Sequence, residues 1–141
     1  MNFFEQELQK IIAPRYPDAT YVGRACYVRL GELNRAKIHF TTCGTAYHYD
    51  ALQITILNRN DGQVDSLRLR FVDVLGKKQV SNPNFRNGIS PYAWTDSGQT
   101  EWYVYKPNAG DYQKLSQALG EYLELFQEQT QVPAPQWQQT M

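Results

Sequence analysis

The residue types that most often carry out covalent chemistry are few in this sequence. Cys26 and Cys43 are the cysteines, and His39 and His48 are the histidines. A histidine beside a thiol would activate the sulfur as a nucleophile. No motif typical of a nucleophile family surrounds either cysteine, so Cys26 is interpreted as a small core residue and Cys43 as a loop thiol. A small enzyme that uses Cys43 and His48 remains an alternative.

Metal binding is less well supported than thiol chemistry. His39, Cys43, His48 and Asp50 lie close in sequence, but zinc sites usually contain cysteines two to four residues apart, and no such pair exists here. The sequence therefore predicts no metal and no cofactor.

Paired carboxylates are the remaining catalytic candidates. Asp61, Asp65 and Asp73 flank one expected hairpin, where turn and strand-end positions explain them without acid–base catalysis. The run 76–78, Gly-Lys-Lys, lacks the upstream glycine and the following helix of a phosphate-binding loop.

We expect a protein that is not an enzyme.

A basic and aromatic surface is the clearest remaining signal. Arg68 and Arg70 alternate with apolar residues along one expected strand, so both project from the same face. Arg24, Arg29 and Lys37 share that face if the first two strands pair, and Tyr27 and Tyr103 add stacking area. Such a face binds single-stranded nucleic acid or protein. The alternative is an ordinary solvated sheet face with cross-strand charge pairs.

A long segment, residues 75–100, is rich in Gly, Asn, Pro and Ser. Irregular segments of this length inside a small domain are often functional. Its two lysines, with Tyr92 and Trp94, are candidates for partner contact, and the alternative is that its aromatic residues anchor the segment onto the core. The predicted partner-binding residues of the whole chain are Arg24, Arg29, Arg68, Arg70, Lys77, Lys78, Tyr92 and Trp94.

Hydrophobic periodicity predicts the elements that position these residues. Helical spacing of apolar residues indicates helices over 2–12 and from Asn108 to about 129. Alternation predicts strands over 21–31, 36–42, 51–59, 66–74 and 101–106. Asp61-Gly62 predicts a hairpin that pairs the third and fourth strands. The expected fold is α+β: a five-stranded, mostly antiparallel sheet with the N-terminal and C-terminal helices packed on one face.

Length and composition set the class of protein. The chain has 141 residues, which suits a single domain over 1–130, followed by a flexible, glutamine-rich tail over 131–141. Neither a secretory signal nor a membrane-spanning run is found, so a cytoplasmic location and reduced cysteines are expected. Fourteen basic residues balance 14 acidic ones, which argues against an acidic nucleic-acid mimic.

The charge is unevenly distributed along the chain. Residues 21–80 contain nine Lys and Arg against five Asp and Glu, whereas residues 107–141 contain one against four. The strand-rich half is therefore mildly basic, and the region of the last helix is acidic.

Six short segments give the chain a family likeness. They are VGRACY (22–27), HYDAL (48–52), LNRNDGQVD (57–65), LRLRF (67–71), GKK (76–78) and WY (102–103). Together they resemble a family of small uncharacterised proteins carried on conjugative transposons and plasmids of Gram-positive gut bacteria. The resemblance covers about residues 2–128, although glycine is commoner in that family where Val28 stands here.

The resemblance implies a function tied to mobile elements. Small accessory proteins of such elements often serve transfer or counter host defence, and some inhibit CRISPR effectors such as Cas9. A non-enzymatic inhibitor that occludes a protein or nucleic-acid-binding surface is therefore expected, with a Cas9-type effector or its guide RNA complex as partner. The alternative is a nucleic-acid-binding accessory factor for conjugative transfer.

Overall fold

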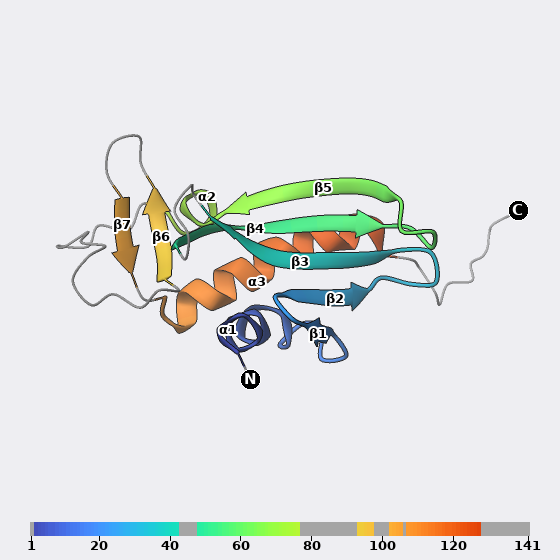
Figure 1. Ribbon diagram of the computed structural model, residues 1–141, viewed down its shortest axis with the longest axis horizontal. Helices are drawn as coiled ribbons and strands as arrows, with labels where there is room; N and C mark the ends of the chain where they lie inside the picture. Colours follow the sequence, from blue (N-terminus) through green and yellow to red (C-terminus); the bar gives the residue numbers. More distant parts are fainter. Residues whose placement is uncertain (1, 43–47, 77–92, 98–101, 106, 128–141) are drawn as a thin grey trace, which may run out of the picture.

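A computed structural model describes residues 2–42, 48–76, 93–97, 102–105 and 107–127. For Thr42, His48 and the segments 93–97 and 102–105, only the backbone is described. The elements in chain order are α1 (Phe3–Ile12), β1 (Thr20–Val22), β2 (Ala25–Arg29), β3 (Arg35–Thr42), β4 (His48–Leu57), β5 (Gln63–Arg70), α2 (Phe71–Leu75), β6 (Ala93–Ser97), β7 (Trp102–Tyr105) and α3 (Ala109–Leu123), followed by a 3-10 turn, Glu124–Phe126 (Figure 1).

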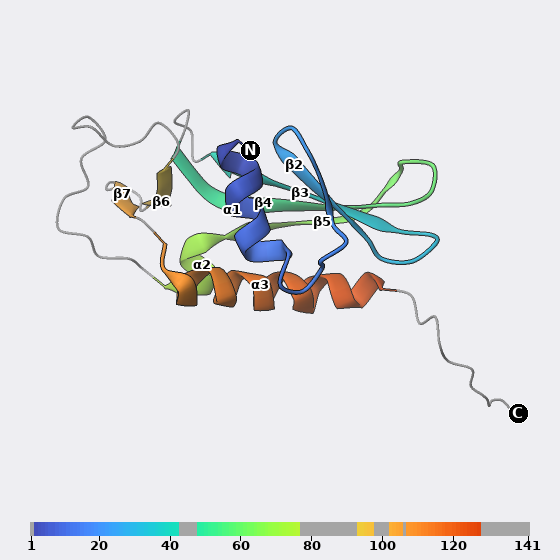
Figure 2. The same cartoon turned by 90° about the horizontal axis from the view of Figure 1, so that it is seen from below.

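Strands β1 to β5 form an antiparallel meander in which each strand pairs with the next. Helices α1 and α3 pack on one face of this sheet (Figure 2). The predicted α+β fold is confirmed, as is the pairing of the third and fourth predicted strands, which are β4 and β5. Their connection contains Asp61 at a φ of 64°, and the Asn58 side-chain oxygen accepts hydrogen bonds from the amides of Asn60 and Gly62.

The residue ranges predicted for two of the strands were wrong. The predicted strand 21–31 is two strands, because Gly23 adopts a φ of 61° and reverses the chain between β1 and β2. The predicted strand 66–74 ends at Arg70, and the buried Phe71 begins the short helix α2. Beyond Ala51, which pairs with Arg70, the same edge of β4 is occupied by β6.

Strand β6 lies within the segment predicted to be irregular. It pairs in parallel with the start of β4, at His48 and Tyr49, and antiparallel with β7. The predicted fifth strand is thus confirmed as β7. The proposed tail, residues 131–141, lies outside the described residues.

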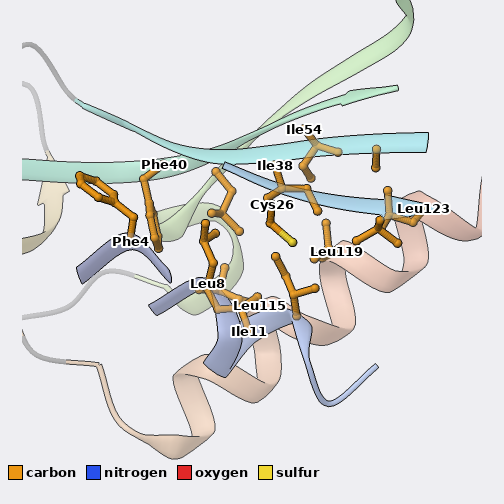
Figure 3. Close-up of a cluster of buried hydrophobic side chains, with 14 of the residues drawn as sticks. Phe4, Leu8, Ile11, Cys26, Ile38, Phe40, Ile54, Leu115, Leu119 and Leu123 are labelled. Atoms are coloured by element: carbon orange, nitrogen blue, oxygen red, sulfur yellow. The ribbon is translucent and has the colours of Figure 1, made fainter. Parts of the chain in front are cut away.

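The core lies between the sheet and the two long helices (Figure 3). Helix α1 begins at Asn2, whose side chain accepts a hydrogen bond from the Glu5 amide, and α3 begins with a reciprocal Asn108–Asp111 capping box. Inward-facing residues of the strands alternate with outward-facing ones, as the sequence predicts. Fully buried side chains include Leu8, Ile11, Ile38, Leu52, Ile54, Ile56, Leu115, Leu119 and Leu123.

A polar contact joins α1 to α3 within this helical layer. The Tyr112 hydroxyl on α3 donates a 2.6 Å hydrogen bond to the Glu7 carboxylate on α1. Lys10 Nζ lies 3.1 Å from the other Glu7 oxygen and 5.2 Å from the centre of the Tyr112 ring. Burial, and then the bond to Glu7, raises the pKa of Tyr112. The buried Glu7 carboxylate therefore has hydrogen-bond and ion-pair partners, which a buried charge needs to be stable.

Candidate binding surface on the sheet

The face of the sheet that points away from α1 and α3 carries alternate residues of β2 to β5, and we call it the outer face. The register aligns Tyr27, Lys37, Thr55 and Ser66 in one cross-strand row. It aligns His39, Gln53 and Arg68 in the next row. Side chains in one row are close enough to bind a partner together.

Basic residues are concentrated on the outer face. Within the described parts of β2 to β5, five basic side chains lie on it against one carboxylate, that of Asp50. The five are Arg29, Arg35, Lys37, Arg68 and Arg70. Helices α1 and α3 show the opposite balance, with four carboxylates and two lysines. The uneven charge seen along the sequence thus becomes a separation between the two layers of the fold.

A β-bulge brings Asp50 to the outer face. Thr41 pairs with Ala51 whereas Thr42 pairs with Tyr49, so Asp50 is the extra residue on β4. The bulge turns Tyr49 into the core and Asp50 toward Arg68. The Arg68 guanidinium lies 2.8 Å from the Asp50 carboxylate, and its Nε lies 3.3 Å from the Thr41 hydroxyl. Asp50 is only 5% exposed, so Arg68 has a structural role in holding a buried charge.

A second anchored arginine lies at the opposite end of the same face. The Arg35 guanidinium stacks 5.3 Å above the centre of the Tyr27 ring and forms an ion pair with Asp61 in the β4–β5 turn. Sequence reasoning missed Arg35 as a site residue because it was assigned to a connection. Extending the alternation of β3 back from Lys37 would have placed it on the outer face.

The predicted partner-binding residues divide into three groups. Arg29, Arg68 and Arg70 lie on the outer face. Arg24 does not join them, because it lies in the β1–β2 turn with its guanidinium 4.7 Å above the Phe4 ring of α1. Lys77, Lys78, Tyr92 and the Trp94 side chain lie outside the described residues.

The residues considered for covalent chemistry are in places that favour structural roles. Burial raises the pKa of the Cys26 thiol to about 12, which leaves the sulfur protonated and unreactive at neutral pH. Asp61 pairs with Arg35, and Asp65 accepts a 2.6 Å hydrogen bond from Tyr122. Asp73 lies in the first turn of α2. Cys43 and the His48 side chain lie outside the described residues.

Metal binding finds no candidate cluster in the described part of the chain. The His39 Nδ1 atom lies 3.2 Å from the carbonyl oxygen of the next residue, Phe40. No group of three His, Cys, Asp or Glu residues with metal-binding geometry occurs among the residues that the structure describes.

The fold and this surface define a small α+β protein with helices on one side of a sheet and a basic face on the other. Comparison of the chain with protein-family models, with curated proteins and with solved structures finds no match. Among the described helices, none combines the length and the apolar character needed to cross a bilayer.

Proposed function

We propose that this chain is a non-enzymatic binding protein that uses the outer face to cover an acidic surface of a macromolecular partner. The observation that carries the proposal is the concentration of basic side chains on this face, opposite an acidic helical layer. Such a charge separation orients an acidic partner toward the outer face and speeds association. A cytosolic site of action is part of the proposal.

Two features suit the face to tight docking. Asp61 and Asp50 hold the guanidinium groups of Arg35 and Arg68, so less side-chain entropy is lost when a partner binds. Arginine and tyrosine are also the residue types that contribute most at protein interfaces. The Arg35–Tyr27 pair near Lys37 is therefore our candidate anchor.

The specific partner that we propose is a Cas9-type effector or its guide RNA complex. This step is supported by the resemblance of six sequence segments to proteins of conjugative elements, and by the charge of the outer face. The protein would act by occlusion, with the outer face covering a protein or nucleic-acid-binding surface of the effector.

A cleavage assay tests this partner. Several Cas9-type effectors are assembled with guide RNA, and cleavage of target DNA is measured with a molar excess of the protein. We expect inhibition by the natural chain, loss of inhibition by Lys37→Glu on the outer face, and full inhibition by Lys114→Glu. Lys114 is exposed on α3, so the control makes the same charge change on the opposite layer. Undiminished cleavage by every effector, without co-purification, refutes the Cas9-type partner.

Direct nucleic-acid binding is a second candidate, as expected of an accessory factor for conjugative transfer. It is favoured by the excess of arginine and lysine on the outer face. It predicts a gel shift of single-stranded DNA or RNA that weakens steeply with salt. Arg70→Ala and Lys37→Ala should weaken the binding of nucleic acid. Arg68→Ala is a poor probe because it also leaves the Asp50 carboxylate without its arginine partner. Affinity independent of salt refutes this candidate.

A further inference from the structure

Strand β5 lies at an edge of the sheet (Figure 1). It pairs with β4 on one side, and no strand in the described part of the chain pairs with its other side. None of its eight residues is buried. In an antiparallel ladder the backbone N–H and C=O groups of alternate residues point away from the neighbouring strand. About half of the backbone groups of β5 are therefore directed outward, where they can pair with another chain.

The open part of this edge is the run Ser66–Arg70. At the start of β5 a bulge interrupts the register just before Leu57, and the helix-facing Asp65 accepts a hydrogen bond from Tyr122. A bulge and an inward-pointing charge both discourage pairing at a sheet edge. After the run, the chain turns into α2. Between these limits the β4–β5 ladder is regular, so an added strand would have a regular template of five residues.

The two sides of this run differ in chemistry. Leu67 and Leu69 point to the helical side, where they pack, partly buried, at the margin of the core. Arg68 and Arg70 point to the outer face. A strand added here would cover the two leucines with one set of side chains and place the alternate set beside the two arginines. The edge therefore fits an extended segment in which apolar and polar residues alternate.

Charge decides which extended segment fits. Antiparallel pairing of Ser66–Arg70 with the same run of a second copy places Arg68 opposite Arg68, because it is the middle residue of the run. Like charges directly opposite are destabilising. Asp50 offsets Arg68 from the β4 side, but the outer face has five basic side chains against two carboxylates even when Asp61 of the β4–β5 turn is counted. A strand that carries carboxylates is therefore favoured over a second copy.

We propose that β5 accepts an extended strand of the partner, paired with Ser66–Arg70, in which apolar residues alternate with Asp or Glu. The apolar side chains cover Leu67 and Leu69, and the carboxylates lie beside Arg68 and Arg70. Main-chain hydrogen bonds supply affinity in this mode of binding, and the alternate side chains supply specificity. This inference rests on the proposed function, since it states how the acidic partner attaches to the outer face.

Amide hydrogen exchange of the full chain, followed by NMR, tests the β5 edge. The probe is a synthetic peptide with a Val-Glu-Val-Glu-Val centre. We expect it to slow exchange at alternate amides of Ser66–Arg70, because those amides point away from β4. One control peptide has a Val-Val-Val-Glu-Glu centre, which keeps the composition but loses the alternation, and another has lysine in place of both glutamates. Both should bind at least about fivefold more weakly.

Two charge reversals on the outer face locate the binding site. Arg70→Glu on β5 should weaken peptide binding at least about fivefold, because it places a like charge beside the peptide carboxylates. Arg29→Glu makes the same change on β2, three strands from β5. That distance is about 14 Å, longer than the screening length of about 10 Å in 0.1 M salt, so the affinity should change less than about twofold. The control peptides keep the test decisive even if a variant folds poorly.

Several results would overturn the inference. They are equal binding of the alternating and rearranged peptides, equal weakening by Arg70→Glu and Arg29→Glu, and unchanged exchange at millimolar peptide. Slower exchange at the same amides on raising the protein concentration alone would favour a second copy instead, and stronger slowing by single-stranded RNA would favour a polyanion. Because Lys37 lies on β3, Lys37→Glu should keep peptide pairing at β5 even if effector inhibition is lost, so this inference and the proposed function can fail separately.

Discussion

Replacing Arg68 by alanine tests whether the bulge at Asp50 depends on its arginine. The substitution leaves a carboxylate that is 5% exposed without the guanidinium 2.8 Å away. Breaking a fully buried pair costs about 3–5 kcal/mol. The Arg68 side chain is 44% exposed, so water can partly replace it, and we expect a loss of about 2 kcal/mol in the free energy of unfolding.

The assay is urea unfolding followed by tryptophan fluorescence, supported by thermal unfolding. For a domain of this size, about 2 kcal/mol corresponds to a decrease of about 4–8 °C in the midpoint temperature. Arg29→Ala is the control, because Arg29 is exposed and donates to a backbone carbonyl; it should change stability by no more than about 0.5 kcal/mol.

A double-mutant cycle makes the test specific. Asp50→Asn removes the charge with little change of shape, and adding it to Arg68→Ala should recover part of the loss, because no buried charge is then left without its arginine. The expected coupling energy is about 1–2 kcal/mol. The reasoning is refuted if Arg68→Ala costs no more than Arg29→Ala, or if the two substitutions are simply additive.

Three further predictions concern the elements that support this surface. Asn108→Ala should destabilise the protein by about 1 kcal/mol in urea unfolding, because it removes the side-chain half of the α3 capping box; an unchanged midpoint would contradict that role. Gly23→Ala should cost about 1 kcal/mol or more, because alanine disfavours a φ of 61°, and an Ala variant of equal thermal stability would disprove strain at this turn. Burial, and then the adjacent Cys26, raises the pKa of Tyr21 to about 12. The folded state therefore holds this proton more tightly than the unfolded state, and stability should fall as the pH rises from about 10 to about 12. Unfolding measured across that range should be less pH-dependent in Tyr21→Phe, and an identical dependence would refute the assignment.

Local sequence patterns predicted most of the fold because each strand or helix is encoded by residues that are close together in the sequence. The alternation of Leu52, Ile54 and Ile56 marked β4 and its buried face, and Asp61-Gly62 marked the hairpin with β5. The apolar spacing that includes Leu115 and Leu119 marked α3. Each of these signals is contained within about 15 residues, where the periods of strands and helices are visible.

The features that sequence reasoning missed depend on contacts between distant residues. The parallel pairing of β6 with β4 joins Trp94 to Tyr49, and no local pattern predicts it. The burial of Asp50 follows from a bulge set by the register between β3 and β4. The Arg35–Asp61 pair forms because the β4–β5 turn reaches the start of β3. Alternation identified the outer face, but only the contacts between distant residues show which of its arginines are held by carboxylates.

The contact between Glu7 and Tyr112 has a consequence for synthesis on the ribosome. Helix α1 emerges from the ribosome well before α3, the helix that packs beside it, because the strands of the sheet lie between them in the sequence. Until α3 has left the exit tunnel, the nascent chain must carry the apolar side of its sheet, including Ile38 and Ile54, partly in contact with water. This interval is when chaperones would be needed most, and a message truncated before residue 109 should yield an aggregating product.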